Sequence, residues 1–154
     1  MKRCSVIALL SVRLVLAADP FVGTWEPNPA KWKSDAPPDN AYRTLTIKWQ
    51  ADGQDHYRTT QYTPDGKHRM GSDGKPTPDL DHFFDRKQHT RGTATVIGQR
   101  LSESNLKETI MGPKGTVHIE YSISADGKTL TQTVNGNGND TGRPLDEVLV
   151  YEKQ

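Results

Sequence analysis

Short runs of alternating apolar and polar residues, separated by tight-turn sequences, constrain the fold of this chain more than any other feature. In residues 43–49, Leu45, Ile47 and Trp49 fall on one face, and threonines and a lysine fall on the other. Residues 117–123 repeat this pattern. Period-two alternation is typical of half-buried β-strands, and helical periodicity does not recur along the chain. We therefore expect an all-β fold with little helix.

The turn sequences indicate how these strands connect. Asp-Gly pairs stand at 52–53, 65–66, 73–74 and 126–127, and further turns are expected at 112–115 and 135–138. Asp-Gly favours tight hairpins, whose two strands are antiparallel neighbours. We expect strands at 22–26, 42–50, 55–63, 80–88, 92–101, 104–111, 116–124, 129–135 and 145–153. These about eight or nine strands predict a single antiparallel up-and-down β-barrel, whose closure removes exposed edges.

Two segments do not fit this meander and are expected to be long loops. Residues 27–40 hold four prolines, and residues 70–79 are rich in glycine and proline. Loops of this length are often functional or mobile. An exposed Trp32 in the first loop would favour a surface for a protein or polymer partner.

The first 18 residues fit the pattern of a cleavable signal peptide. Lys2 and Arg3 precede a mostly apolar stretch, and small residues follow it at positions 17 and 18. Arg13 interrupts the apolar stretch and weakens the pattern. We expect residues 1–18 to be removed and residues 19–154 to form one exported domain, periplasmic or secreted. The alternative is an apolar N-terminus on a cytosolic protein.

Composition limits what this domain can contain and bind. The only cysteine, Cys4, lies in the predicted signal, so residues 19–154 can form no disulfide. Removing Lys2, Arg3 and Arg13 lowers the basic count from 20 to 17 against 19 acidic residues, a net charge of −2. This balance predicts no nucleic-acid surface and no polybasic membrane patch, and we expect no membrane span after cleavage. Only 37 apolar residues follow the signal, which fits a barrel with a wet cavity better than a filled sandwich.

Both ends of the predicted domain resemble the lipocalin and fatty-acid-binding superfamily. Residues 23–25, Gly-Thr-Trp, match its Gly-x-Trp opening, and residues 150–153, Val-Tyr-Glu-Lys, resemble the last strand of intracellular fatty-acid-binding proteins. The whole of 19–154 is similar to small secreted lipocalin-like proteins of environmental bacteria, a group without an established function. The resemblance implies a lipocalin-like (calycin) barrel that binds a small, partly apolar molecule in its interior.

The resemblance also implies a structural motif of Gly23, Trp25 and Lys153. In such barrels the Trp packs across the closed end, and a cation from the last strand, here Lys153 or Arg143, lies on its indole face. Leu149 departs from the family, since fatty-acid-binding proteins hold the ligand carboxylate with an Arg at this position. The 27–40 loop also replaces their helical lid. Fatty acid binding by the family's arrangement is therefore not expected.

Candidate ligand contacts are aromatic and polar side chains of the expected strands: Trp49, Tyr57, Arg58, Tyr62, Phe84, His118, Tyr121 and Tyr151. Within 56–62 two orientations remain open. Either the odd-numbered residues, including Tyr57, face inward, or the even-numbered residues, including Arg58 and Tyr62, do. An inward Arg58 would clamp an anion, and an outward one would form a surface ion pair. His118 and Glu120 share one face, which lines a polar cavity or faces solvent.

No catalytic motif or metal-ligand spacing is present. The chain has no zinc-type histidine spacing among His56, His68, His82, His89 and His118, and no nucleophile elbow, phosphate loop or Cys–His pair. Three aspartates near His82 (Asp79, Asp81 and Asp85) could form an acid–base cluster, but turn chemistry explains them equally well. We predict no catalytic residue, metal or cofactor.

Three functions compete at this stage. The preferred one is binding of a small, apolar or amphipathic molecule inside the barrel. The second is an interaction or structural module of the cell envelope without a small ligand, which an exposed apolar patch would favour. The third is an enzyme on the same barrel, which a strongly perturbed titratable group inside a pocket would favour.

Overall fold

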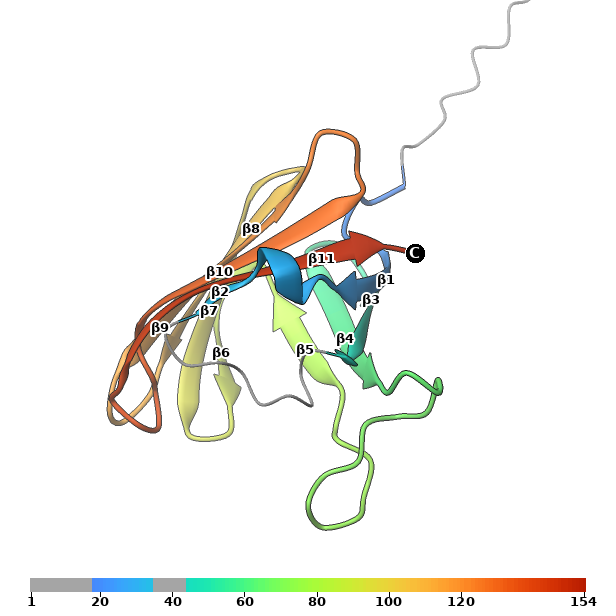
Figure 1. The fold of residues 1–154 in the computed structure, drawn as a ribbon. Helices are drawn as coiled ribbons and strands as arrows, with labels where there is room; N and C mark the ends of the chain where they lie inside the picture. The colour runs from blue at the N-terminus through green and yellow to red at the C-terminus, as the bar shows by residue number, and fades with distance from the viewer. Residues whose placement is uncertain (1–17, 35–43) are drawn as a thin grey trace, which may run out of the picture.

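The structure, a computed structural model, describes residues 18–34 and 44–154, whose strands form one nearly closed antiparallel barrel (Figure 1). The strands are β1 (Gly23–Pro27), β2 (Lys33–Ser34), β3 (Thr46–Ala51), β4 (His56–Tyr62), β5 (Leu80–Phe83), β6 (Asp85–Arg91), β7 (Ala94–Ser102), β8 (Asn105–Met111), β9 (Thr116–Ile123), β10 (Thr129–Asn137) and β11 (Pro144–Lys153). A short 3-10 turn, η1 (Pro29–Lys31), follows β1. The predicted all-β barrel is confirmed, with more strands than expected.

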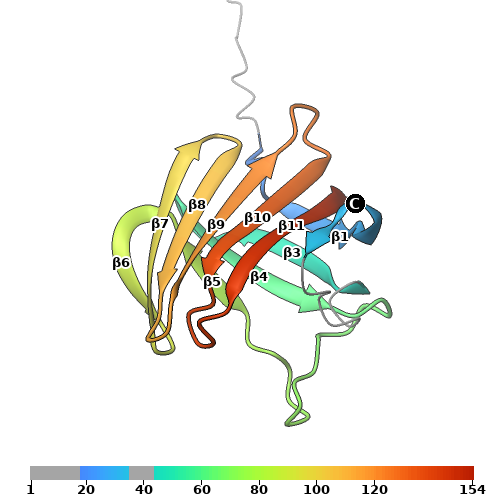
Figure 2. The same ribbon diagram turned by 60° about the vertical axis from the view of Figure 1, so that its left-hand side comes forward.

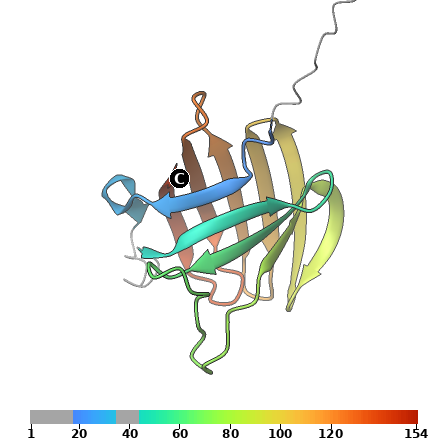
Figure 3. The same ribbon diagram turned by 90° about the vertical axis from the view of Figure 1, so that its right-hand side faces the viewer.

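The strands pair in the order β5-β4-β3-β1-β11-β10-β9-β8-β7-β6, and β2 adds to β11. β1 joins the two halves, because it pairs with β3 on one side and with β11 on the other. β1, β3 and β4 form one layer that crosses the strands β7 to β10 steeply (Figures 2 and 3). The two ends of this order, β5 and β6, follow one another in sequence but have no ladder between them in the described chain. We call this opening between β5 and β6 the seam.

The seam explains one difference from the expected strands. Residues 80–88 were expected to form one strand, but β5 ends at Phe83 and β6 begins at Asp85. Between them Phe84 is buried, its N–H donates to Asp55 O at 2.7 Å, and its carbonyl accepts from Arg100 N–H at 3.3 Å. The chain turns a corner at Phe84, where both backbone groups are hydrogen-bonded. Because the alternation of inward and outward residues continues through this corner, the sequence pattern does not reveal the corner.

Two other segments differ from the expected loops and turns. The expected loop at 27–40 contains η1 and β2, and β2 pairs with β11. Residues 35–40 of that loop lie outside the described residues. The expected turn at 135–138 belongs partly to β10, which runs to Asn137; the chain reverses over 138–143, where Gly138 N–H donates to Arg143 O at 2.8 Å.

The remaining turns follow the sequence closely. The glycine of each Asp-Gly pair has positive φ, between +71° and +98°, as tight turns of this kind require. The long loop between β4 and β5 projects from the barrel (Figure 1, green) and is tied by isolated bridges between Tyr62 and His68 and between Met70 and Pro76.

A cluster of buried side chains that includes Phe21, Trp25, Trp49, Tyr57 and Phe84 forms the hydrophobic core of the barrel. Trp25 is fully buried and its Nε1 donates to Phe21 O at 3.0 Å.

The motif at the first strand has a steric basis. Lys153 supplies the cation, with Nζ 5.1 Å from the centroid of the Trp25 ring, and it donates to Pro20 O at 3.2 Å. Gly23 has φ +148°, and a Cβ there would lie 2.7 Å from Lys153 Cε. Glycine is therefore needed where the lysine stem crosses the first strand to reach the indole.

The described residues contain no helix long and apolar enough to cross a membrane. The predicted signal peptide, residues 1–18, lies outside the described residues except for its last position.

Candidate ligand-binding site

A cavity of about 300 Å³ lies inside the barrel beside the hydrophobic core. Its apolar wall comes from β3, β5 and β8 to β11, and comprises Ile47, Trp49, Leu80, Ile110, Ile119, Leu130 and Leu149. Its polar groups are Thr59, Gln61, His82, Arg91, Tyr121, Gln132 and Tyr151. Ligand pockets in proteins typically measure about 300–1,000 Å³, so this cavity suits a small molecule.

Strand alternation places these side chains in the cavity. On β4 the odd-numbered residues face inward: Thr59 and Gln61 line the cavity, and Tyr57 is buried next to it. The same alternation turns Ile119 and Tyr121 of β9 inward. The orientation that the sequence left open on residues 56–62 is therefore the one with Tyr57 inside.

The predicted ligand contacts fall into three groups. Trp49, Tyr121 and Tyr151 line the cavity. Tyr57 and Phe84 belong to the hydrophobic core, where their rings meet at 5.9 Å. The first group is thus placed to touch a ligand directly, and the second supports the floor beneath it.

The third group, Arg58, Tyr62 and His118, does not line the cavity. Arg58 Nε lies 2.9 Å from Asp81 Oδ1 in an exposed ion pair. Tyr62 packs edge-on against His68, with ring centroids 4.9 Å apart. His118 Nδ1 lies 3.2 Å from Thr109 Oγ1 of the adjacent strand. All three sit one residue out of phase with the inward positions, and a shift of one residue exchanges the two faces of a strand.

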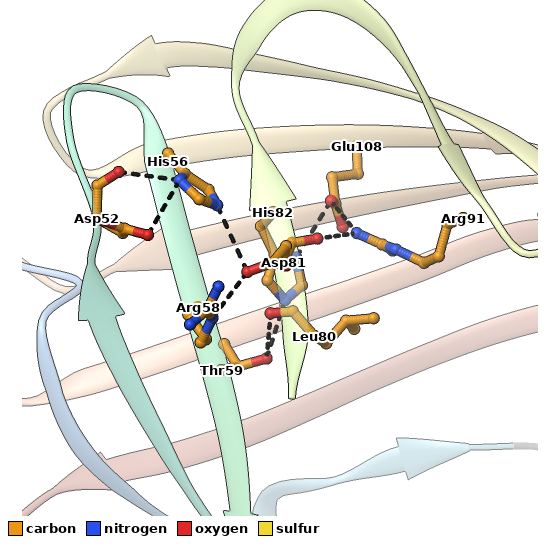
Figure 4. A network of polar contacts seen from close by, with 9 residues as sticks. All are labelled: Asp52, His56, Arg58, Thr59, Leu80, Asp81, His82, Arg91 and Glu108. Carbon is orange, nitrogen blue, oxygen red and sulfur yellow. Dashed lines mark hydrogen bonds and ion pairs between the residues drawn. The ribbon is translucent and has the colours of Figure 1, made fainter. Parts of the chain in front are cut away.

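Sequence reasoning missed the most unusual group in the barrel, the buried carboxylate of Glu108. Glu108 is 0 % exposed, and its Oε1 lies 3.1 Å from His82 Nδ1 and 3.0 Å from Arg91 Nη2 (Figure 4). Tyr121 donates its hydroxyl to Glu108 Oε2 at 3.1 Å. We call Glu108, His82, Arg91 and Tyr121 the interior cluster. The sequence carries one signal for it: Glu108 interrupts an apolar face between Leu106 and Ile110.

The interior cluster fixes the ionisation of its members. Burial alone would raise the pKa of Glu108, but the charges and hydrogen bonds of His82 and Arg91 outweigh it and lower the pKa to about 2. Burial, reinforced by the charge of Glu108, raises the pKa of Tyr121, and burial likewise raises the pKa of Tyr151. Near neutral pH Glu108 is therefore an ionised carboxylate, and Tyr121 and Tyr151 are neutral phenols.

His82 is held from both sides. Its Nε2 lies 3.0 Å from Thr59 Oγ1, and its ring stacks on Trp49 at 5.1 Å with an interplanar angle of 18°. Both ring nitrogens therefore have polar partners, Glu108 at Nδ1 and the Thr59 hydroxyl at Nε2. The ring is thus a fixed part of the cavity wall.

Arg91 connects the cavity to the seam. Its Nη2 donates to Asp81 O at 2.7 Å, so the side chain reaches from β6 to β5 where the two strands are unpaired (Figure 4). Arg91 and Leu80 line both the interior cavity and a second hollow of about 220 Å³ at the seam. These two side chains therefore stand between the interior and the outside of the barrel.

The aspartates around His82 do not form an acid–base cluster with it. Asp79 accepts from Thr60 Oγ1 at 2.8 Å, Asp81 pairs with Arg58, and Asp85 Oδ1 lies 2.9 Å from His89 Nε2. In residues 18–34 and 44–154 no three His, Cys, Asp or Glu side chains are gathered as metal ligands.

Comparison with known proteins shows the fold. No family model matches the sequence, and no curated protein matches it. A Schistosoma mansoni fatty acid binding protein in complex with arachidonic acid is similar at TM-score 0.56 and 18% identity, over 88% of this chain and 96% of that one. A variant of the fluorescent protein UnaG is similar at TM-score 0.58 and 13% identity, over 88% and 96%. The chain thus has the barrel fold of the fatty-acid-binding proteins.

Proposed function

We propose that this protein binds a small, partly apolar molecule inside its barrel. One observation carries the proposal: the cavity of about 300 Å³ inside the barrel combines an apolar wall with hydroxyl, amide, imidazole and guanidinium groups. That distribution is typical of sites that bury an apolar body and orient it by a few hydrogen bonds. The similar barrel from Schistosoma mansoni, a fatty acid binding protein in complex with arachidonic acid, supports small-molecule binding by a barrel of this fold.

The alternative of a surface interaction module depends on an exposed Trp32, and the structure does not provide one. Trp32 is not an exposed anchor: its Nε1 donates to Val150 O at 2.8 Å, and its ring lies 6.0 Å from that of Tyr151. Trp32 is therefore partly buried against Tyr151 and packs on the hydrophobic core. Its packing gives no support to a docking surface centred on this residue.

The enzyme alternative would need a titratable group in the cavity with a pKa near the working pH. Glu108 is strongly perturbed, but its pKa is lowered, and its two oxygens already accept from three side chains. Such a carboxylate is a poor general base. It serves better as a fixed counter-charge inside a binding site.

A pair of tryptophan substitutions on β9 tests the binding proposal. Ile119 lines the cavity, and the adjacent His118 does not. We expect the neutral fluorophore prodan to bind the wild-type protein with a blue-shifted emission, Ile119→Trp to abolish this binding by filling the cavity, and His118→Trp to retain it. Equal binding by both variants would place the fluorophore outside the barrel and overturn the proposal.

We also propose that residues 1–18 direct export and are then removed. The charged start, the apolar stretch and the small residues at 17 and 18 support this. Expressed in a Gram-negative host, the protein from the periplasm or medium should have a mass that begins at Asp19. An intact chain confined to the cytosol would contradict the proposal.

A further inference from the structure

The cavity has one permanently cationic side chain, Arg91, and the protein already neutralises it. Nη2 of Arg91 lies 3.0 Å from Oε1 of Glu108 and 2.7 Å from the carbonyl of Asp81, so both of its hydrogens have acceptors. The Arg91 side chain is 26% exposed and Glu108 is 0% exposed. The cation therefore faces the cavity, and its counter-ion lies behind it.

A ligand carboxylate at Arg91 would have to share that cation with Glu108. Two anions on one guanidinium leave a negative charge that Arg91 does not compensate, beside a carboxylate that is itself fully buried, and unpaired charge is expensive there. Glu108 cannot relieve this by moving, because His82 and Tyr121 also hold its oxygens at 3.1 Å. The remaining donors of Arg91 suit a neutral oxygen better than an anionic one.

Apart from His82, whose two ring nitrogens already contact Glu108 and Thr59, the other polar groups of the cavity carry no charge. Thr59, Gln61 and Gln132 offer a hydroxyl and two amides, and Tyr151 is a neutral phenol. Arg69 reaches the Gln61 amide, with Nη1 2.9 Å from Oε1, but it does not line the cavity. Leu149, the cross-strand neighbour of Gln132, contributes an apolar side chain to the same wall.

We infer that the barrel selects uncharged amphipathic molecules, with a hydroxyl, carbonyl or amide as the polar group, over carboxylates with the same apolar chain. The inference rests on the proposed function and names the chemical class of the ligand. It separates this chain from the similar Schistosoma mansoni barrel, whose bound arachidonic acid carries a carboxyl group.

Matched ten-carbon ligands test this on the wild-type protein. Decanol, decanamide, decanoate and decylammonium each compete with prodan at about pH 8, where decanoate is a carboxylate and decylammonium is a cation. We expect decanol and decanamide to displace prodan at concentrations at least about tenfold lower than decanoate or decylammonium. Decanoate as the equal or stronger competitor would overturn the inference but leave the binding proposal standing. Failure of prodan and all four ligands to bind would overturn the proposed function itself.

Neutralising the counter-ion should change the preference. Glu108→Gln keeps the shape of the side chain and leaves the charge of Arg91 uncompensated, so decanoate should gain at least about tenfold relative to decanol. The matched control is Glu120→Gln on β9, whose carboxylate pairs with Lys107 at 3.3 Å away from the cavity and whose loss should leave the preference unchanged. An unchanged preference in folded Glu108→Gln would refute the role of the counter-ion. If that variant does not fold, the order of the four ligands on the wild-type protein decides.

Discussion

At the scale of single residues, the interior of this barrel is defined by a few buried polar side chains rather than by its aromatic ones. The carboxylate of Glu108 orders His82, Arg91 and Tyr121 around itself at 3.0–3.1 Å. Removing one partner of a buried ion pair typically costs about 3–5 kcal/mol, because the other partner is left unpaired. The interior cluster should therefore matter to stability as well as to ligand choice.

The depressed pKa of Glu108 gives the protein an acid-sensitive contribution to stability. A carboxylate with an ordinary pKa of 4.5 and a folded-state pKa of about 2 stabilises the native state fully above pH 4.5 and loses this effect as pH falls towards 2. Urea unfolding should show Glu108→Gln destabilised by on the order of 3 kcal/mol near neutral pH. The difference in unfolding free energy between the wild-type protein and this variant should narrow below pH 4.5. A difference that does not change with pH would contradict the ion-pair account.

Three buried tyrosines make the stability of the native state fall as pH rises in the alkaline range. Burial raises the pKa of Tyr57, Tyr121 and Tyr151 above the ordinary value of 10, and a hydrogen bond to Asp19 adds to the effect at Tyr57. Above pH 10 the unfolded chain releases protons that the native chain retains, so stability falls as pH rises. In a spectrophotometric titration these three phenols should ionise together with the loss of near-UV circular dichroism. Their ionisation in a protein that keeps its near-UV signal would be inconsistent with their burial.

How far single residues can be placed from sequence depends on the phase of each strand. The resemblance at both ends of the chain identified Trp25 and Lys153, which meet at 5.1 Å. Alternation alone could not choose between Tyr57 and Arg58 as the inward residue, because both faces of β4 carry polar and aromatic side chains. Glu108 escaped notice because an isolated acidic residue in a strand is usually solvent-exposed.

At the scale of elements, the corner at Phe84 is the feature that the alternation could not show. The corner passes directly over β7, where a Cβ on Gly98 would lie 1.9 Å from Phe83 O. A glycine within a strand marks close approach of another backbone, and this is the signal that could have revealed the corner. The hairpins were easier to predict, because Asp-Gly turns determine them locally.

Substitution of Gly98 should therefore be unusually costly. We expect Gly98→Ala to lower the free energy of unfolding by about 3 kcal/mol, because the added methyl group must displace the backbone of the corner. Gly66→Ala is the control, since φ there is +76° but nothing lies within 4 Å of the added Cβ; backbone strain alone should cost about 1 kcal/mol. Chemical denaturation of the two variants measures the loss of unfolding free energy in each. Equal losses would mean that the corner yields easily.

At the scale of the whole molecule, the apolar content is too low for a filled sandwich, and the chain instead forms a barrel with a packed core and a cavity beside it. The fold class followed from alternation and turns, since both are properties of the chain alone. The cavity and its charge could not be derived in that way, because they depend on which faces of strands distant in sequence meet. Similar barrels at 13–18% identity share the architecture without fixing the lining.

The central claim, that the ligand lies inside the barrel, is tested most directly by methyl NMR during titration of the protein with decanol. Ile47, Ile110 and Ile119 line the cavity, and Ile97 and Leu101 are exposed, so the chain provides inner and outer methyl groups in one spectrum. Shifts of the three inner isoleucines, with Ile97 and Leu101 unmoved, are the predicted result. Shifts confined to Ile97 and Leu101, or no saturable shift of any methyl group, would contradict the account.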